Sequence, residues 1–473
     1  MFIKTKNIIL ALAVIIVAAS CKKEKLSPIP QTILSDAVAF GSADRIAQQV
    51  TGAYSVVKNG NFLGGRALVY VDVRGEDWLN VTGNNVTAAQ VWSNNLVSTD
   101  NQVEGLWSTA YAAINRINVV LKGLDDNPAA ITTTLANNYR GELRFLRALC
   151  YYNLATTYSK KPYAADMGAS LGVPLRLVAN QASGAEALAR ATMAQVFTQI
   201  LVDLNFAETN LPLNNGSAEN NIVRAHRNAA IALKTRVYLQ MGDYPNLIVE
   251  GNKLVPAAGP FAALSGIAHN LNSNFVNVFR APYQALESIF SFPMNNTNQP
   301  GTQNGLSLYH NAEFSLNNTG VGILQDVNWK LTDARRTLVT SSSRYTKFND
   351  DINNYVPILR YSEVLLNTAE ALARQAAGAT VDARALAILN AVRQRSDATT
   401  IFAPLTKTDL VNLILNERRI ELLGEGFRVW DLQRQLLPFP AKASAPSVAV
   451  NAAPYVWPIP GSELLYNNLA VPN

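Results

Sequence analysis

Residues 416–434 read NERRIELLGEGFRVWDLQR, a stretch in which charged side chains stand between apolar ones. As a helix that begins near Thr408, the sequence places apolar residues on one broad stripe at helical spacing: Leu410, Leu413, Ile414, Ile420 and Leu423. Glu417 and Glu421 lie in or beside that stripe rather than opposite to it. Gly424 and Gly426 then end the helix. The sequence therefore predicts a helix that carries two carboxylates into a buried interface.

Those two carboxylates have two interpretations. A general acid/base pair is one, because side chains four residues apart on a helix lie ~5 to 6 Å apart at Cβ. The other is an ion-pair clamp, since Arg418, Arg419, Arg428 and Arg434 stand within a few turns and a paired arginine keeps a carboxylate ionised. We favour the clamp, formed by Glu417, Glu421, Arg418 and Arg428, which would lock the C-terminal helix onto the body of the protein.

The composition is that of a large globular protein. The chain has 473 residues, of which 48% are hydrophobic and 16% charged, enough for one big domain or two intimate ones. The net charge of +6 is spread without a basic block, so nucleic acid is not an expected partner. Cys21 and Cys150 stand in different contexts and predict no disulfide framework; Cys150 falls on an apolar helical face, as a buried free thiol would.

The N-terminus has the pattern of an exported lipoprotein. Lys4 and Lys6 precede the apolar run from Ile8 to Ala19, which has the length of a signal-peptide core rather than of a membrane span. Residues 18–21, Ala-Ala-Ser-Cys, resemble a bacterial lipobox, which predicts cleavage after residue 20 and acylation of Cys21. Acyl chains would hold the protein on a membrane. We expect a signal peptide over 1–20, the lipidated cysteine and a tether over 21–40, and one domain over 41–473.

Most of the remaining chain has helical periodicity. Helices are predicted at Ala43–Val57, around Trp107–Leu121, at Asn137–Tyr158, and from a cap at Thr192 to a stop at Pro212. Residues 227–255 resemble a tetratricopeptide-type helix pair with its turn at Gly242, and Tyr361–Gln375 with Ala383–Gln394 form a second pair. The predicted fold is mostly α, a tetratricopeptide-like repeat scaffold of about four helix pairs.

Two irregular regions interrupt the predicted scaffold, at about residues 60–102 and 256–354. Both are rich in Asn, Gly and aromatic residues, as loops with short strands or turns are, and Ile289–Phe292 is a predicted strand. Loops of such length inside a compact domain are usually functional. The two regions therefore form the expected loop-rich ligand-binding face.

The order of several motifs resembles the SusD/RagB family of outer-membrane nutrient-binding lipoproteins. They are GELRFLRALCYYNLATTY at 141–158, GDY at 242–244, ESIFSF at 287–292, TDARR at 332–336, ILRYSEVLLNTAEALA at 358–373, LNAVRQR at 389–395, the stretch at 416–434, and WPIP at 457–460. The resemblance implies four tetratricopeptide-like helix pairs and an irregular binding face. It also implies a lipid-anchored partner of a SusC-like TonB-dependent transporter in the outer membrane, which binds oligosaccharides or, in some members, peptides.

The sequence contains no recognisable catalytic constellation. His226, His269 and His310 are scattered and show no zinc-binding spacing, and there is no nucleophile elbow or phosphate-cradling loop. We therefore expect a protein that is not an enzyme and that holds no cofactor or metal. Asp72, Glu76 and Asp77 could hold a calcium ion, but turn and cap roles are the preferred interpretation.

Ligand binding is expected instead at aromatic and amide side chains of the irregular regions. Aromatic faces stack on the C–H faces of sugar rings, and amides bond to hydroxyl groups. The residues predicted for this role are Trp78, Trp92, Asn94, Tyr283, Tyr309 and Trp329. The leading hypothesis is capture of oligosaccharides at the cell surface. Two alternatives remain: the same role for peptides or another nutrient, and a tetratricopeptide-type adaptor that binds protein partners.

Overall fold

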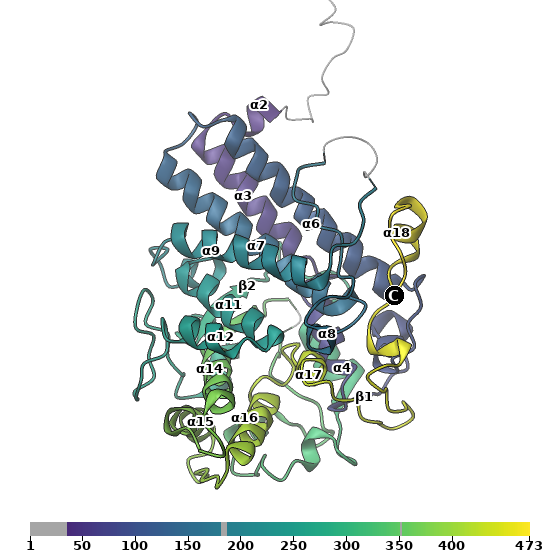
Figure 1. Ribbon diagram of the computed structural model, residues 1–473, viewed down its shortest axis with the longest axis vertical. Coiled ribbons are helices and arrows are strands. Elements are labelled where there is room, and N and C mark those ends of the chain that lie inside the picture. Colours follow the sequence, from purple (N-terminus) through teal and green to yellow (C-terminus); the bar gives the residue numbers. More distant parts are fainter. Residues whose placement is uncertain (1–35, 181–186, 351) are drawn as a thin grey trace, which may run out of the picture.

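The computed structural model describes residues 36–180, 187–350 and 352–473. Its helices pack side by side in chain order, from an N-terminal group of long helices to a C-terminal group of shorter ones (Figure 1). Irregular segments run along several sides of this array, and two small two-stranded sheets lie among them and the helices. The predicted signal peptide, Cys21 and most of the tether lie in residues 1–35, outside the described residues.

The N-terminal group consists of α3 (Ala43–Val57), α6 (Asn101–Asp126), α7 (Thr133–Tyr158) and α9 (Met193–Asn210). Each helix packs on the next, and α9 then packs on α11. The sequence predicted all four, and the cap at Thr192 is confirmed as a capping box with Gln195. α7 is buried over nearly its whole second half, including Cys150, which is a buried free cysteine as expected. Burial raises the pKa of this thiol far above its ordinary value.

The later helices continue the array as pairs. α11 (Arg227–Met241) and α12 (Tyr244–Gly251) join at Gly242, whose φ of +70° is left-handed and suits glycine. α14 (Tyr361–Gln375) packs on α15 (Ala383–Ser396) and α16 (Lys407–Glu421), and α17 (Arg428–Gln433) follows. The helix-rich architecture with tetratricopeptide-like pairs is therefore confirmed.

The irregular regions contain more regular structure than expected. β1 (Trp78–Asn80) pairs with β3 (Phe314–Leu316), and β2 (Ser288–Phe292) pairs with β4 (Val356–Arg360), both antiparallel. The prediction of loops over 60–102 is wrong at α4 (Arg66–Val73), because the β-branched residues of RALVYVDV hide a helix that is buried almost all round. Shorter helices are α2 (Asp36–Ala39), α5 (Ala89–Trp92), α8 (Tyr163–Asp166), α10 (Asn220–Val223), α13 (Leu306–Leu308) and α18 (Gly461–Tyr466).

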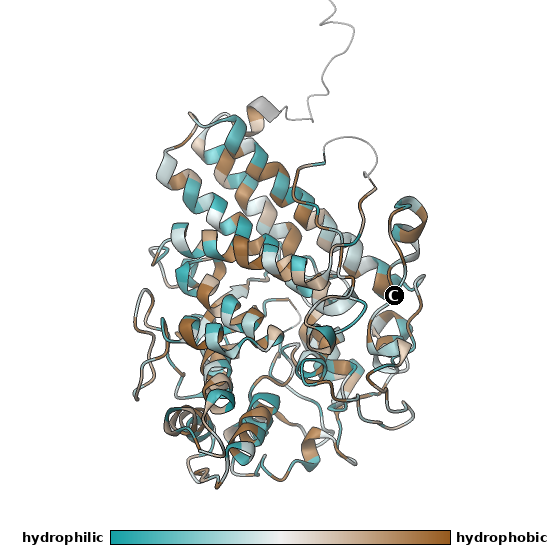
Figure 2. Cartoon of the chain, in the orientation of Figure 1, coloured by the Kyte–Doolittle hydropathy of each residue, from teal (hydrophilic) through white to brown (hydrophobic). Residues whose placement is uncertain are grey.

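One continuous hydrophobic core joins the helices to the irregular segments. Apolar and polar residues both occur around the outer helices, which offer the core one apolar face, whereas α4 and the second half of α7 are buried on nearly all sides (Figure 2). None of the helices in the described part of the chain is long and apolar enough to cross a membrane. The fold thus rests on layered helix packing, with the irregular segments anchored to the same core.

Glu417 and Glu421 are fully buried on α16 and paired, as the clamp interpretation predicts. Their partners, however, come from elsewhere in the chain. Glu421 contacts the guanidinium groups of Arg335, Arg360 and Arg395 at 2.8, 3.0 and 2.6 Å. Burial would raise the pKa of Glu421, but Arg395, Arg360 and Arg335 outweigh it and hold that pKa well below its usual range. Glu421 is therefore an ionised, structural group.

These contacts belong to a buried cluster of ten charged side chains, which we call the charge cluster. Its members are the acids Glu287, Asp333, Glu417, Glu421 and Glu425 and the bases Arg335, Lys347, Arg360, Arg393 and Arg395. Each side chain is at most 4% exposed. Acids and bases balance one for one, which removes the large cost of burying an unpaired charge. The charge cluster ties β2, β4, α15 and α16 together.

The arginines of the opening stretch serve other pairs, which corrects the predicted partners. Arg418 bonds to Asn367 and Asp431. Arg419 and Arg428 reach Asp77 and Glu76, at 2.9 and 3.0 Å from their Nε atoms. Arg434 pairs with Glu370 and Asp431. The clamp therefore exists: Asp431 pairs with Arg418 and Arg434 within the stretch, and the other ion pairs join α16 and α17 to distant segments.

Asp72, Glu76 and Asp77 hold the C-terminal segment. Asp72 accepts hydrogen bonds from the backbone N–H groups of Gly426, Phe427 and Arg428 at 2.9 to 3.2 Å. Burial raises the pKa of Asp72 to about 7. Burial would also raise the pKa of Glu76, but Arg428 and Arg419 lower it to about 2. In the residues that the structure describes, no group of three or more His, Cys, Asp or Glu side chains is arranged to hold a metal ion.

Candidate functional site

Five of the six predicted binding residues lie in the interior. Trp78, Tyr309 and Trp329 are at most 1% exposed, and Trp92 and Asn94 are 8% and 7% exposed. Trp78 stacks on His310 with ring centroids 4.7 Å apart. Aromatic side chains in loops bury a large apolar area when they pack into a core. Here the tryptophan and tyrosine rings pack into the core and are not exposed at the surface.

Polar contacts inside the protein also occupy these side chains. Trp92 donates its Nε1–H to the carbonyl of Trp78 at 2.7 Å, and Asn94 accepts from Arg74 Nε at 2.9 Å. Tyr309 accepts from Arg66 Nε at 3.2 Å, and the Arg336 guanidinium lies 4.2 Å from the Trp329 ring centroid. The structure contradicts the predicted stacking role of Trp78, Trp92, Tyr309 and Trp329, whose rings are buried, and the predicted hydroxyl-binding role of Asn94, whose amide is buried and bonded to Arg74.

Tyr283 is the predicted binding residue that remains accessible, and it belongs to a pair. Its ring is half-buried and stacks on that of Tyr355, with centroids 4.7 Å apart and ring planes 11° from parallel. Tyr283 has a left-handed φ of +59°, uncommon for a bulky residue, and its N–H bonds to the carbonyl of Arg280 at 2.8 Å. This backbone turn directs the Tyr283 ring against the ring of Tyr355, the residue immediately before β4.

Hydrogen bonds fix both rings of this tyrosine pair. Tyr283 Oη donates to Asn354 Oδ1 at 3.3 Å, and Tyr355 Oη donates to Glu219 Oε1 at 3.3 Å. The pair thus joins three segments that are far apart in sequence, around residues 219, 283 and 355. A preformed aromatic surface of this kind loses little conformational entropy when a ligand stacks on it.

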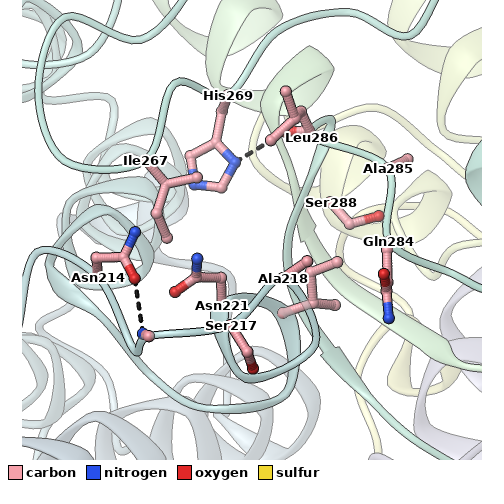
Figure 3. Close-up of a pocket in the computed structure, with 12 residues that line it drawn as sticks. Asn214, Ser217, Ala218, Asn221, Ile267, His269, Gln284, Ala285, Leu286 and Ser288 are labelled. Atoms are coloured by element: carbon pink, nitrogen blue, oxygen red, sulfur yellow. Dashed lines mark hydrogen bonds between the residues drawn. The ribbon is translucent and has the colours of Figure 1, made fainter.

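A cavity of about 260 Å³ opens beside the tyrosine pair. It lies between the loop after α9, α10, and the segment that enters β2, and its lining includes Gln284, next to Tyr283, and Ala218, next to Glu219. Figure 3 shows its amide and hydroxyl side chains, among them Asn214, Asn221, Gln284 and Ser217, together with the apolar side chains of Ile267, Ala218 and Leu286, of which Ala218 and Leu286 are exposed. Such a lining offers donors and acceptors together with apolar contact.

His269 forms the inner wall of the cavity and is uncharged at neutral pH. It is 1% exposed, and burial lowers its pKa to about 4. Its Nδ1 donates to the carbonyl of Leu286 at 2.8 Å (Figure 3), because a carbonyl can only accept. The ring also stacks on His226, with centroids 5.4 Å apart. His269 therefore anchors the wall of the cavity and supplies no charge to it.

A larger cavity of about 780 Å³ lies between residues 94–98, 160–165 and the C-terminal segment 450–459. Its lining is dominated by aliphatic and proline side chains, and its aromatic residues, Tyr455 and Trp457, are each 1% exposed. It has no accessible aromatic ring that could stack on a ligand. We therefore take the smaller cavity with the tyrosine pair as the candidate site.

Sequence reasoning identified Tyr283 but missed the rest of the candidate site. Tyr355, Asn354 and the amides at 214, 221 and 284 come from separate irregular segments, and no spacing in the sequence connects them. The usable signal was limited to composition, since both 256–354 and the loop after α9 are rich in Asn.

Comparison with known proteins gives a consistent result. Residues 26–239 match a family model described as SusD-like, starch-binding and associating with the outer membrane, and residues 290–445 match the model of the SusD family. SusD-like protein P2 of Formosa agariphila is 24% identical over 512 residues, which covers 94% of each chain.

Solved structures share the fold. A SusD superfamily protein from Bacteroides fragilis is 31% identical, with a TM-score of 0.83 over 91% of this chain and 99% of that one. A protein described as a laminarin-binding SusD-like protein is 20% identical, with a TM-score of 0.66 over 91% of this chain and 99% of its own. At 20% sequence identity, the similarity to the laminarin-binding protein concerns the fold alone.

Proposed function

Because this chain belongs to the SusD/RagB family, we propose that it is a lipid-anchored cell-surface protein that captures oligosaccharides and passes them to a SusC-like TonB-dependent transporter in the outer membrane. In this proposal Cys21 carries the lipid anchor, the ligand is not chemically altered, and neither a cofactor nor nucleic acid takes part. The lipobox-like Ala-Ala-Ser-Cys at 18–21 supports the anchor.

The tyrosine pair beside an amide-lined cavity is the observation that carries oligosaccharide binding. One outer ring face would stack on the C–H face of a sugar, and amide and hydroxyl groups of the cavity would bond to its hydroxyls. The cavity volume of about 260 Å³ lies just below the ~300 to 1,000 Å³ of typical ligand pockets. We therefore infer that the cavity receives the end of a chain and that the tyrosine pair supports the neighbouring unit.

Peptide capture is the second candidate, and the same site would serve it differently. Extended peptides bind through backbone hydrogen bonds to an exposed strand edge. The strands β2 and β4 are buried along their whole length, and β1 and β3, which are partly exposed, are only three residues long, which favours a side-chain site and hence the glycan ligand.

The test is a titration of full-length protein in detergent against a panel of oligosaccharides and peptides. We expect saturable binding to at least one oligosaccharide. Tyr283→Ala and Tyr355→Ala should each weaken that binding by about 1 to 3 kcal/mol, while Tyr283→Phe, which keeps the ring, should change it little.

Two control variants separate local from general effects. Val97→Ala lies in the larger cavity and Tyr466→Ala changes an exposed ring on α18, and neither should affect affinity. Binding to peptides with no binding to any glycan would refute the proposed ligand. Loss of affinity in Val97→Ala but not in the tyrosine variants would move the site to the larger cavity.

A further inference from the structure

The lining of the candidate cavity carries no formal charge. None of its 12 residues is Lys, Arg, Asp or Glu. His269, the histidine among them, is held neutral because burial lowers its pKa to about 4. A sulfate or carboxylate group entering this cavity would lose water without gaining a cation, which is costly. Hydroxyl groups, by contrast, meet the amides of Asn214, Asn221 and Gln284, although the Oδ1 atoms of the two asparagines also accept backbone N–H groups, each at 2.7 Å.

The rim of the candidate site is acidic. Glu219 is exposed and accepts the hydrogen bond from Tyr355 at 3.3 Å, so its carboxylate stands at one end of the tyrosine pair. Asp350 stands near the other end. Backbone N–H groups of Asn353 and Ile352 donate to its carboxylate and lower its pKa, which keeps it ionised. Burial and then the charge of Asp350 raise the pKa of Tyr283, and the charge of Arg280 opposes them. Both ends of the aromatic surface therefore carry negative charge.

The positively charged group beside Tyr283 is the Arg280 guanidinium, whose Nη groups are bonded to backbone carbonyls. The Arg280 guanidinium donates to the carbonyls of Phe279, Thr346 and Lys347 at 2.9, 2.9 and 2.7 Å. Arg224, at the end of α10, pairs with Glu142 at 2.7 Å. Recognition of sulfate or carboxylate groups normally uses an arginine fork or a lysine turned toward the ligand.

We propose that the candidate site selects neutral glycans and rejects sulfated or uronic-acid-bearing ones. This inference rests on the proposed function, because it names the substrate class of the same site. Rejection comes from two sources, a cavity lining without a cation and two carboxylates, Glu219 and Asp350, at the ends of the tyrosine pair, which have the same sign as the anionic groups. Like charges within ~10 Å repel noticeably at an ionic strength of 0.1 M, and this repulsion weakens as salt is added.

The test compares matched ligands on the full-length protein in detergent. Each neutral oligosaccharide of a panel is titrated alongside its chemically sulfated derivative and alongside uronic-acid oligosaccharides of similar length. We expect saturable binding to at least one neutral member and at least ten-fold weaker binding to its sulfated form. Equal or tighter binding of any anionic glycan would overturn the inference while leaving glycan capture intact. Failure of every glycan to bind would overturn the proposed function and this inference with it.

A pair of charge-reversal variants tests the role of the rim. Glu219→Lys should raise the affinity for the sulfated ligand relative to the neutral one by several-fold, because it replaces a repulsive charge with an attractive one. Asp44→Lys makes the same change on the exposed face of α3, away from the site, and should leave the ratio of the two affinities unchanged. Equal shifts in both variants would show a general charge effect and refute the assignment to the rim.

Discussion

Glu421 is the residue on which the charge cluster converges, since three arginines contact its carboxylate. Glu421→Ala would leave those cations buried and short of one negative charge. Breaking a buried ion pair by removing one partner typically costs about 3 to 5 kcal/mol. We expect a loss of that order in the free energy of unfolding, measured by urea denaturation, which leaves charges unscreened.

Asp44→Ala is the matched control, because Asp44 is exposed on α3, and it should change stability little. Ligand affinity of the folded fraction of Glu421→Ala should equal that of the unaltered protein. A selective loss of affinity at unchanged stability would refute the structural assignment of Glu421.

The need of Glu421 for partners was predictable from the sequence, but the identity of the partners was not. A carboxylate on an apolar stripe must be paired, which the pattern around α16 makes clear. Its arginines stand 86, 61 and 26 residues away, and only the tertiary fold brings them together. The same limit applies to Trp78 and Tyr283. Both are aromatic residues in polar segments, and whether the ring plugs the core or faces water depends on packing that the local sequence does not encode.

At the scale of the element, α16 depends on its N-terminal capping box. Thr406 accepts from the N–H of Asp409 at 3.1 Å, and Asp409 accepts from the N–H of Thr406 at 3.2 Å. Thr406→Ala removes the first of these bonds and should destabilise the protein by ~1 kcal/mol. Thermal unfolding followed by circular dichroism measures the change.

Thr408→Ala is the control for this substitution, because Thr408 is an exposed residue of the same helix outside the cap. An equal loss of stability in Thr406→Ala and Thr408→Ala would show that the effect is not specific to the capping position. No loss in Thr406→Ala would show that packing alone fixes the start of α16.

The amphipathic helix α3 was predictable, and the short, apolar helix α4 was not. α3 was predicted with the bounds Ala43–Val57 that the structure shows, because its stripe has a period of 3.6. α4 has apolar residues on every side, which leaves no period to detect, and its valines favour a strand locally. Tertiary burial decided the conformation of α4.

For the whole molecule, three buried histidines make stability depend on pH. Burial lowers the pKa of His226 to about 3, of His269 to about 4 and of His310 to about 3. The unfolded chain takes up these protons below a pH of ~6.5 and the folded chain does not. The histidines therefore stabilise the fold fully above that pH, and their contribution is lost as the pH falls. Asp72 and Asp77, whose pKa values are raised by burial, act in the opposite direction but are fewer.

We expect the urea concentration at the midpoint of unfolding to decrease as the pH is lowered from 6.5 to 5. His310→Phe should make this fall shallower, because neither ring nitrogen of His310 has a hydrogen-bond partner and the ring packs between Trp78 and Phe348. A midpoint that is constant over this range, or a slope unchanged in His310→Phe, would contradict the assignment of neutral buried histidines.

The balance of the charge cluster also constrains the order in which this protein can be completed. Synthesis proceeds from the N-terminus, so Arg335, Lys347, Arg360, Arg393 and Arg395 are all made before Glu417, Glu421 and Glu425. A chain that stops at Asn416 holds five cations against two carboxylates, Glu287 and Asp333, and cannot bury them. We therefore expect the segments that carry the charge cluster to close only after Glu417, Glu421 and Glu425 have been made.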